Sequence, residues 1–411
     1  MRIMIAELTI DQLGSQGDGV AEAPSGPVFV PFTLPGERVS AKVTPDKKYA
    51  DCITILDASP KRVDPVCPHF GVCGGCALQH METSSYLDWK RDCVVRALRS
   101  RGLNAAVEPA RAVPLGNRRR AVFHIERRGK ELVLGYRRAR SHDTIDIEVC
   151  PILSARIVAA LPAIKALVAP LLGDRREARI TVTDTENGLD LAVKGVPPPD
   201  AALAKLAGIA EEHGLARIAL GSESLLFAPT TLRLGRALVS LPPGAFVQAS
   251  PIAEAEMVEL VCQGVGKSKR VADLFSGLGT FSFALAERAT VDAYESSAEA
   301  LAALSEAARH ATRLKPMRTH RRDLLRDPLG WRELKDFDAV VFDPPRAGAA
   351  AQAAQLAKSK VKHVAAVSCN PATLARDLRL LVDGGYEISQ VVPIDQFLYS
   401  SHIEVVAHLA R

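Results

Sequence analysis

The pattern of apolar and polar positions changes at about residue 250. After that point, short apolar runs such as "RVADLF", "TVDAYE" and "FDAVVF" alternate with helical patterns at 251–263, 298–308 and 347–357. Apolar strands separated by helices are typical of a parallel sheet with helices on both faces. The pattern therefore predicts a Rossmann-like α/β domain over residues 246–411.

The first part of the chain has a different pattern. Residues 1–58 are short β-rich runs punctuated by glycine and proline, as in "GPVFVPFTLPGERVSAKV", which predicts a small β-barrel. Residues 59–245 contain a cysteine cluster, a helix at 83–102 and β-rich segments with helices at 154–170 and 199–213, which predicts a central α+β domain. We therefore expect a multidomain α/β protein.

Length and composition agree with this division. A chain of 411 residues is too long for one ordinary core, and 47% hydrophobic with 24% charged residues is a globular balance. No apolar run is long enough to span a bilayer, and "MRIMIAELTI" lacks a signal-peptide core. We expect a cytoplasmic protein whose eight cysteines are reduced and available for metal binding or catalysis.

Charge is distributed unevenly. Residues 117–140 hold nine Lys/Arg against two Glu, which favours a polyanionic partner such as RNA; the alternative is a solvated charged face. Residues 1–57 carry five Lys/Arg and eight Asp/Glu, a net charge of −3, so RNA contact there would depend on a local patch such as Lys47-Lys48-Tyr49. The basic segment is the better candidate for an RNA-contact surface.

A glycine-containing turn follows the first strand of the C-terminal domain, in "ADLFSGLGTFSFALAE". Gly277 and Gly279 let the backbone turn tightly and approach a ligand. Ser282 stands where a dinucleotide fingerprint would have its third glycine, and there is no phosphate-loop lysine. The turn therefore suits a ligand that has no pyrophosphate.

Acidic residues follow the next three strands in order. Glu295 ends "TVDAYE", where a carboxylate can accept from both ribose hydroxyls, Asp323 could accept from an adenine amino group, and Asp343 opens "DPPR". The carboxyl ends of parallel strands form the ligand crevice of such sheets. This arrangement predicts S-adenosylmethionine as cofactor and a methyltransferase as function.

The cysteine cluster "CPHFGVCGGC" contains Cys67, Cys73 and Cys76, and Cys150 is a distant candidate for the fourth ligand. Two cysteines separated by two residues can reach one metal centre, and four thiolates suit either zinc or a [4Fe–4S] cluster. The spacing is therefore compatible with either zinc or a [4Fe–4S] cluster.

Cys369 lies between an apolar strand, "KHVAAV", and a helix start at Asn370-Pro371. This position is expected to lower the pKa of its thiol and to expose the sulfur at the strand-end cleft, next to Asp343. A thiol is needed to methylate a poorly nucleophilic carbon such as uracil C5, because its attack on C6 generates an enolate.

The same reaction needs a base for the C5 proton. Alternation in "HIEVVAHL" is expected to place His402 and Glu404 on one face of a strand. Glu404 is the preferred base, since a carboxylate is available at neutral pH, and His402 is the alternative.

Taken together, these motifs resemble the RNA 5-methyluridine methyltransferases, over nearly the whole chain. The most similar branch is the bacterial one that carries a TRAM domain and an iron–sulfur cluster and modifies 23S ribosomal RNA. "GSQGDGVAE" resembles TRAM, "SCNPATLARDL" the nucleophile motif and "FLYSSHIE" the general-base motif. Leu398, Ser400, Ser250 and Ser276 depart from the usual residues, but none of these departures removes a catalytic group.

The resemblance implies roles for individual residues. Cys369 and Glu404 would be catalytic, and Cys67, Cys73, Cys76 and Cys150 would hold a [4Fe–4S] cluster. S-adenosylmethionine would be bound by Gln248, Phe275, Gly277, Thr280, Glu295, Asp323 and Asp343. The expected protein is a monomer that methylates C5 of a uridine in RNA, with ribosomal RNA favoured over transfer RNA.

Two other functions remain open. Methyltransferases that act on an exocyclic nitrogen usually have an aromatic residue after the two prolines, whereas Arg346 stands there, and their chemistry needs neither Cys369 nor Glu404. A non-catalytic iron–sulfur RNA-binding or redox-sensing protein would account for residues 1–150 only.

Overall fold

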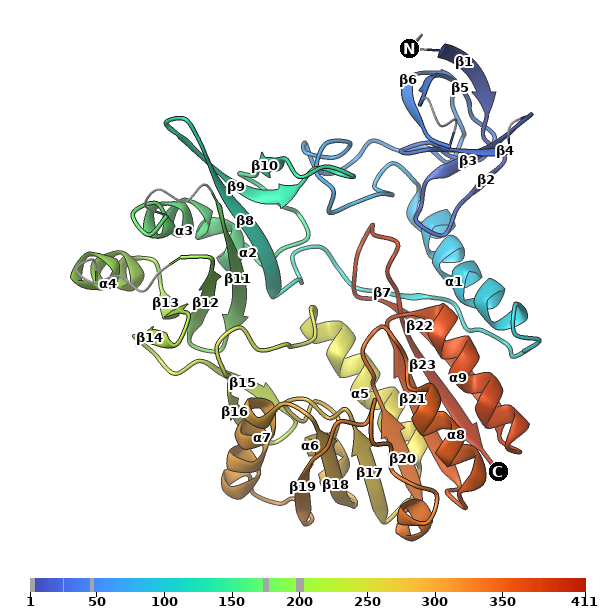
Figure 1. Ribbon diagram of the computed structural model, residues 1–411, viewed down its shortest axis with the longest axis vertical. Helices are drawn as coiled ribbons and strands as arrows, with labels where there is room; N and C mark the ends of the chain where they lie inside the picture. The colour runs from blue at the N-terminus through green and yellow to red at the C-terminus, as the bar shows by residue number, and fades with distance from the viewer. Residues whose placement is uncertain (1–3, 25, 45–47, 173–176, 197–202) are drawn as a thin grey trace.

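Eight strands form the largest sheet of the computed structural model, which describes residues 4–24, 26–44, 48–172, 177–196 and 203–411 (Figure 1). Their order is β19-β18-β17-β20-β21-β23-β22-β7. The strands are β7 (Arg111–Ala112), β17 (Arg270–Leu274), β18 (Thr290–Glu295), β19 (Met317–Arg321), β20 (Ala339–Phe342), β21 (His363–Ser368), β22 (Glu387–Asp395) and β23 (Glu404–Ala410).

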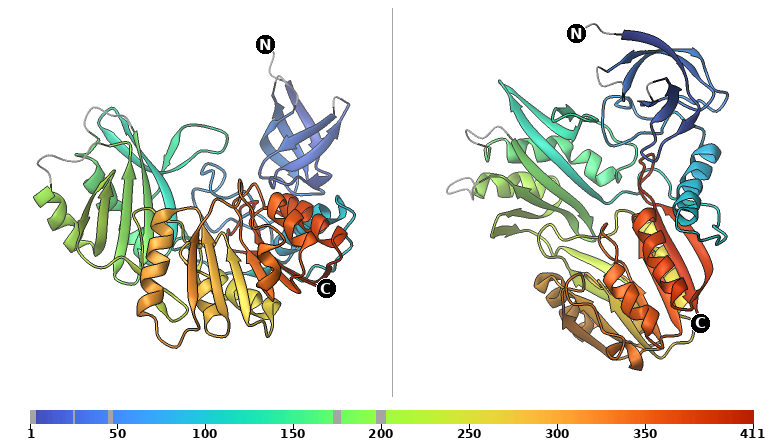
Figure 2. Two further views of the ribbon diagram at one scale, coloured as in Figure 1. Left: turned by 60° about the horizontal axis from the view of Figure 1, so that its bottom comes forward. Right: turned by 45° about the vertical axis from the view of Figure 1, so that its right-hand side comes forward.

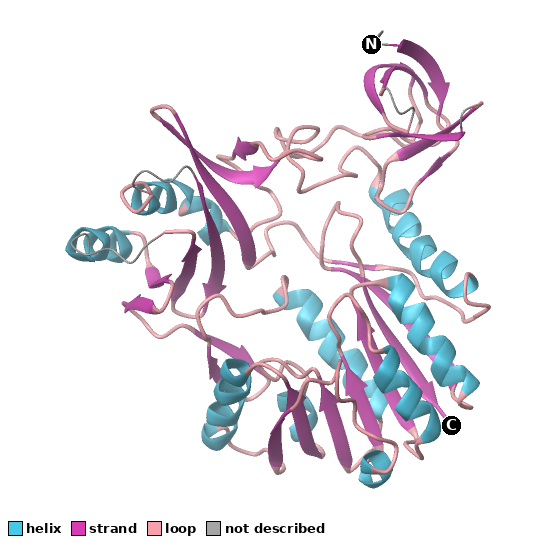
Figure 3. Ribbon diagram, viewed as in Figure 1, coloured by secondary structure: helices cyan, strands magenta, loops and turns pink. Residues whose placement is uncertain are grey.

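The five strands from β19 to β21 are parallel, and β23 inserts antiparallel between β21 and β22. Helices cover both faces of the sheet (Figure 3). They are α5 (Pro251–Val265), α6 (Ser282–Ala286), α7 (Ala298–His310), α8 (Ala350–Lys358) and α9 (Pro371–Asp383), with a short 3-10 helix at Glu333–Asp336. Alternation within β20 explains the two layers, because Val340 packs in the core with α8 and α9, and Val341 packs in the core with α5. The doubly wound sheet predicted from the sequence is confirmed.

A seven-stranded sheet, β10-β9-β8-β11-β12-β13-β14, forms the central part. Its elements are β8 (Arg120–Arg128), β9 (Glu131–Arg137), β10 (Thr144–Asp146), β11 (Glu177–Thr185), β12 (Gly188–Lys194), β13 (Leu215–Leu220), β14 (Glu223–Leu226), and helices α2 (Ala155–Ala159), α3 (Leu161–Val168) and α4 (Leu203–Glu212). Side chains of α2, α3 and α4 pack on one face of the sheet in a single core. In the part of the chain that the structure describes, no helix packs on the opposite face (Figure 2).

Two three-stranded antiparallel sheets, β1-β5-β6 and β2-β3-β4, make the N-terminal part. The strands are β1 (Met4–Thr9), β2 (Gln12–Leu13), β3 (Gly19–Ala23), β4 (Gly26–Val30), β5 (Arg38–Val43) and β6 (Ala50–Asp57). Side chains of both sheets share one small core. The β-rich fold is as expected, whereas the strand pairing shows two sheets and does not establish a closed barrel.

The packing units differ from the boundaries expected at residues 58 and 245. Helix α1 (Thr83–Arg99) packs against α9 and β22, and β7 pairs with β22, so residues 83–112 belong to the core of the C-terminal sheet. The hairpin of β15 (Thr231–Leu234) and β16 (Ala237–Ser240) packs with α6 and α7. The C-terminal unit therefore includes residues that precede the central sheet in the chain and residues that follow it.

Among the described residues, no helix is both long enough and apolar enough to cross a membrane.

Candidate active site

Strand pairing brings three predicted residues together. Asp343 follows β20 and Cys369 follows β21, and these neighbouring strands are parallel with Phe342 opposite Ala366. Glu404 begins β23, whose next residue Val405 pairs with Ser368. The carboxyl ends of β20 and β21 and the start of β23 thus meet at one edge of the sheet.

Cys369 precedes a well-capped helix. Asn370 is the N-cap of α9, its Oδ1 accepts from the Ala372 amide at 3.1 Å, and Pro371 occupies the first turn. The expected lowering of the thiol pKa is wrong, however. Burial, with nearby Glu404 and Asp343, raises the pKa of Cys369 to about 11, although Arg346 opposes this. The increase in the thiol pKa from desolvation and two carboxyl groups is therefore larger than the decrease expected from the helix start.

Glu404 is buried and belongs to a chain of side-chain amides. Gln396 Nε2 donates to Glu404 Oε1 and to Gln248 Oε1, both at 2.9 Å, and Gln396 Oε1 accepts from the Ala249 amide at 3.0 Å. Gln248 Nε2 in turn donates to Asp343 Oδ2 at 3.3 Å. The chain links the candidate base to the carboxyl group at the cofactor side.

The expectation that Glu404 is a ready carboxylate at neutral pH needs correction. Burial, with nearby Asp343, raises the pKa of Glu404 to about 8, while its hydrogen bond from Gln396 lowers it. Burial therefore favours the protonated form of this side chain. A positive charge placed beside it would shift it toward the carboxylate.

His402 lies in the turn before β23, since the strand begins at Glu404, so the expected shared strand face is not formed. Nη2 of Arg346 lies 2.7 Å from Nδ1 of His402. Burial and nearby Arg346, Lys90 and Arg118 lower the pKa of His402 to about 4. The imidazole is therefore neutral and a weak base, which leaves Glu404 as the better candidate.

The turn after β17 holds Glu295 in place. The Gly277 amide donates to Glu295 Oε2 at 3.0 Å, and the Ser297 amide donates to Oε1 at 2.8 Å. Phe275 and Gly277 have φ values of 61° and 55°. A Cβ at Gly277 would meet no atom within 4 Å, so space for a ligand lies above this glycine.

Asp273 lies at the end of β17 and is fully buried. Its Oδ2 accepts from Ser282 Oγ at 2.5 Å, but its Oδ1 has no partner among the described residues. Burial raises the pKa of Asp273 to about 7, and burial also raises the pKa of Asp343 to about 7. Several buried carboxyl groups at one sheet edge, with an unpartnered oxygen among them, suit a ligand with positive charge, such as the sulfonium and ammonium of S-adenosylmethionine.

Two other predicted cofactor residues have different neighbours, although the Arg322 amide, next to Asp323, donates to the Glu295 carbonyl at 2.9 Å. Thr280 lines a cavity of about 1030 Å³ between the central sheet and α5, together with Arg119, Glu254 and Cys262. Asp323 lies beyond the end of the edge strand β19, with Oδ1 accepting from the Leu325 amide at 3.1 Å. The cofactor roles of Thr280 and Asp323 stay predictions.

The four predicted ligand cysteines line one cavity of about 540 Å³, which also contains Phe397 and residues 400–402 of the turn before Glu404. Burial raises the pKa of Cys76 to about 12, and the nearby sulfurs of Cys150, Cys73 and Cys67 contribute. Among the described residues, no three His, Cys, Asp or Glu side chains are placed so that they could hold a metal ion. The iron–sulfur cluster is therefore not shown.

The segment after Cys76 holds the turn that precedes Glu404. The amides of Ala77 and Leu78 donate to the Tyr399 carbonyl at 2.7 and 3.1 Å. Tyr399 has a φ of 58°, and its amide donates to Tyr86 Oη at 2.7 Å. Hydrogen bonds therefore connect the segment beside the cysteine cavity to the turn that precedes the candidate base.

A buried ion pair anchors the same turn. Lys90 Nζ donates to Asp395 Oδ1 at 2.8 Å and to the carbonyl of His402, and both charged side chains are fully buried. Tyr86 Oη donates to Asp395 Oδ2 at 2.5 Å. Helix α1 thus fixes both ends of the segment from Asp395 to His402.

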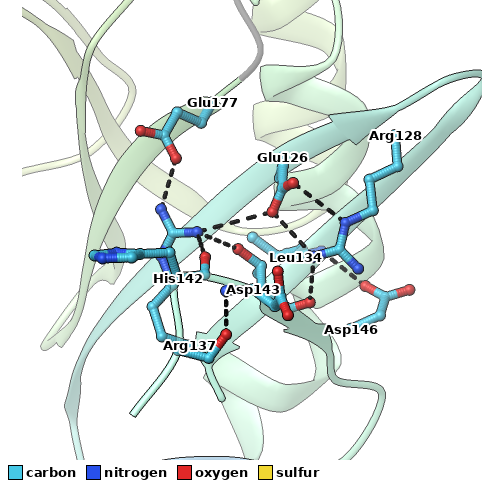
Figure 4. A network of polar contacts seen from close by, with 10 residues as sticks. Glu126, Arg128, Leu134, Arg137, His142, Asp143, Asp146 and Glu177 are labelled. Carbon is cyan, nitrogen blue, oxygen red and sulfur yellow. Dashed lines mark hydrogen bonds and ion pairs between the residues drawn. The ribbon is translucent and has the colours of Figure 1, made fainter. Parts of the chain in front are cut away.

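Three of the nine cations in the basic segment form ion pairs, and Figure 4 shows the network around two of them, Arg128 and Arg137. Arg137 Nη2 lies 2.6 Å from Glu177, and Arg128 contacts Glu126 through two hydrogen bonds at 3.1 and 3.2 Å. Arg119 forms a buried pair with Glu254 at 2.6 Å. These three arginines have carboxylate partners, and the expected RNA-contact surface on this segment stays a prediction.

Sequence reasoning did not assign roles to Gln396, Arg346 or Asp273. Gln396 stands eight residues before Glu404, in a segment without a recognisable period, so nothing in the sequence indicated it. Arg346 and Asp273 stand inside recognised motifs and could have been found by their position at strand ends. Ser250, which replaces the usual Asn, caps α5 by accepting from the Ala253 amide at 3.1 Å.

Comparisons with known proteins agree with this site. Residues 235–411 match the tRNA (Uracil-5-)-methyltransferase family, and residues 5–50 match the TRAM domain. An RNA methyltransferase of Rhizobium meliloti is 48% identical, covering 98% of this chain and 99% of the relative. The 23S rRNA (uracil(1939)-C(5))-methyltransferase of Pectobacterium atrosepticum is 31% identical, covering 97% and 92%.

One solved structure is similar over nearly its whole length. The Pyrococcus abyssi tRNA (uracil-54, C5)-methyltransferase, in complex with S-adenosyl-L-homocysteine, has a TM-score of 0.75 and 22% identity, covering 98% of this chain and 99% of that one. At this identity the likeness establishes the fold.

Proposed function

Because this chain belongs to the S-adenosylmethionine-dependent RNA uracil-C5 methyltransferases, we propose that it methylates one uridine of 23S ribosomal RNA through a covalent adduct on Cys369. The observation that carries the mechanism is the meeting of Cys369, Glu404 and Asp343 at one sheet edge. The target base would have to leave its stack to reach that edge.

Cys369 begins the reaction as a thiolate. Its sulfur bonds to C6 of the uracil, and the C5–C6 electron pair moves onto the carbonyl oxygen as an enolate. S-adenosylmethionine, when bound, supplies the methyl group that C5 accepts. Arg346 is the cation near Cys369 and opposes the rise of its pKa, so it favours the attacking form.

Glu404 completes the reaction. Its carboxylate removes the proton from C5, the C5–C6 double bond re-forms, and the C6–S bond breaks to release the Cys369 thiolate. Gln396 orients the carboxylate through the 2.9 Å hydrogen bond. Asp343 and Asp273 favour a cationic ligand close by, and that positive charge would lower the pKa of Glu404.

Two rivals are weaker. Methylation of an exocyclic nitrogen uses neither a thiol nor a buried base, and would leave the position of Cys369 beside Glu404 without a role. A non-catalytic RNA-binding protein would not need the Gln396 chain between Glu404 and Asp343.

The adduct can be trapped directly. RNA with 5-fluorouridine at the target has no removable C5 proton, so it should stay attached to the enzyme through Cys369 after methyl transfer. Denaturing gels should show a shifted band with the wild type and with Cys93→Ala, a matched half-buried cysteine, and no shifted band with Cys369→Ala. Trapping that survives in Cys369→Ala would refute the mechanism.

The target RNA is a separate part of the proposal. The relative from Pectobacterium atrosepticum supports 23S ribosomal RNA, whereas the family description favours transfer RNA as the alternative. Mapping 5-methyluridine in both RNAs from a deletion strain distinguishes them. Loss of the modified nucleotide from transfer RNA alone would show that the substrate is transfer RNA.

We also propose that Cys67, Cys73, Cys76 and Cys150 hold a [4Fe–4S] cluster. Sulfurs around one zinc ion, each at about 2.3 Å, would lie within about 4 Å of one another. A cluster binds each thiolate to a different iron and spreads the sulfurs more widely. The four cysteines line one cavity, and the similarity of "CPHFGVCGGC" to the four-cysteine motif of the family supports the cluster. The cluster would fix the segment that hydrogen-bonds Tyr399.

Spectroscopy tests this assignment. Protein purified without oxygen should absorb visible light, lose this absorption with dithionite, and contain iron and sulfide. Cys73→Ser should abolish the absorption, and Cys262→Ser, in α5, should keep it. Colourless protein that contains zinc would contradict the cluster.

A further inference from the structure

The face of the central sheet that carries no helix displays a row of cations. Side chains of Ile180, Val182, Leu191 and Val193 point into the core under α2–α4, so their neighbours along β11 and β12 point to the other face. That face therefore carries Arg179 on β11, Lys194 on β12 and Arg120 on β8. Figure 1 shows α3 and α4 on the side of this sheet away from β20–β23.

Two of these cations are directly opposite each other. Arg179 pairs with Lys194 across β11 and β12, and both side chains are exposed. Like charges at directly opposed positions are destabilising in an antiparallel pair. No ion pair joins either one to a carboxylate in the part of the chain that the structure describes.

Of the three cations, Arg120 has its charge and hydrogen-bonding groups least satisfied by its neighbours. Its guanidinium is half-buried, and its Nε has no hydrogen-bond partner among the described residues. Burial and the nearby Arg118 and Arg179 lower the pKa of Arg120. Arg128, at the other end of the same strand, has Glu126 as its carboxylate partner.

An exposed aromatic ring adjoins Arg120. Phe246 is 67% exposed, and the guanidinium of Arg120 lies 5.7 Å from its ring centroid. The following residues lead into the active site, because Arg119 Nε donates to the Gln248 carbonyl at 3.0 Å and the Arg119 amide to the Ala249 carbonyl at 2.8 Å. Arg118 likewise lies 5.7 Å from the ring centroid of Phe397, which is next to Gln396.

We propose that Arg120, Arg179 and Lys194 bind the phosphates of a single RNA strand, and that Phe246 stacks on a base of that strand beside the target nucleotide. Uncompensated guanidinium and ammonium groups on a sheet face are complementary to a polyanion. An exposed ring among them provides a stacking surface that a paired base would not reach. The inference rests on the proposed function and assigns RNA contact to three cations and one ring, of which only Arg120 belongs to the basic segment.

Salt dependence of RNA binding tests the cations. Fluorescence polarisation of a labelled oligouridine would be measured at several KCl concentrations. Each of Arg120→Gln, Arg179→Gln and Lys194→Gln should reduce the slope of log Kd against log [KCl] by about 0.7, and the triple variant by roughly 2. Arg120→Lys should keep the slope, as should Arg128→Gln, the ion-paired control on the same strand. An unchanged slope in the triple variant, or an equal loss in Arg128→Gln, overturns the proposal.

Phe246 is tested by affinity at one salt concentration. Phe246→Leu should weaken oligouridine binding by about fivefold or more without altering the slope, whereas Phe246→Tyr should retain affinity. An equal affinity for Phe246→Leu and the wild type would remove the stacking base from the proposal. S-adenosylhomocysteine binding, measured by calorimetry on every variant, reports whether the C-terminal domain has folded.

Failure here can be distinguished from failure of the proposed chemistry. Tritium release from RNA labelled at uridine C5 measures the chemistry alone. Release by the wild type with no change of slope in the variants would refute only the RNA-binding face. A changed slope without any tritium release would refute only the uracil-C5 reaction.

Discussion

Glu404 lies beside Cys369 because Val405, the second residue of β23, pairs with Ser368, the last residue of β21. An antiparallel pair places the start of one strand against the end of the other. A residue 35 positions later in the chain thereby reaches the position where a base must act. This relationship leads to the first predictions.

Glu404→Gln should stop the reaction after methyl transfer. The amide cannot remove the C5 proton, so the methylated adduct on Cys369 should accumulate with ordinary uridine RNA. Denaturing gels should show the shifted band with this variant and little of it with wild type. Absence of the band, with full methylation retained, would assign proton removal to another group.

The rate at which methylated RNA is released should rise with pH. Cys369 must lose a proton to attack C6 and Glu404 must lose one to accept the C5 proton, and their pKa values are raised to about 11 and about 8. We therefore expect log kcat for the complete turnover to increase from pH 6 to 9. A bell-shaped profile that falls above neutral pH would contradict this assignment.

Glu404→Gln should also stabilise the ligand-free protein at alkaline pH. The pKa of Glu404 is higher in the folded chain than in the unfolded one, so the folded state holds the proton more tightly and loses stability as pH rises toward 8. Thermal unfolding should show a higher midpoint for the variant at pH 8.5 and a much smaller difference at pH 5. A difference independent of pH would argue against titration of this group.

Gln396→Met should shift the pH profile toward alkaline values. The hydrogen bond from Gln396 lowers the pKa of Glu404, and its loss leaves burial and Asp343 unopposed. S-adenosylhomocysteine binding should also weaken, because Gln248 loses a partner. Gln390→Met, on β22 just before Gln396, removes a hydrogen bond to Glu108 and is the matched control. A loss of rate with an unshifted profile would indicate a merely structural role for Gln396.

Lys90→Met should be strongly destabilising. It leaves Asp395 buried without its cation, which costs about 3–5 kcal/mol, whereas Lys165→Met breaks an exposed pair of similar length and costs about 0–1 kcal/mol. Urea unfolding compares the two variants. Lys90→Met/Asp395→Leu should recover part of the loss, and equal effects of the two single variants would show that burial of the pair is unimportant.

The sequence by itself determined the order of strands, helices and chemical groups. Apolar runs after residue 250 specify a parallel sheet, and a residue that follows such a run lies at the ligand edge whatever its neighbours are. Asp343 and Cys369 could therefore be placed next to each other before any coordinates were known. Asn370 and Pro371 also fixed the start of α9, because capping is a local property of the chain.

Only the tertiary structure decided the electrostatics of the site. The pKa values of Cys369 and Glu404 depend on burial and on carboxyl groups from other strands, and both differ from the values expected from local context. Gln396 gained its role through contacts with Gln248, 148 residues earlier in the chain. In the basic segment, Arg119 and Arg137 have carboxylate partners on other elements, whereas Arg120 has none among the described residues. A charge pattern in the sequence does not specify these partners.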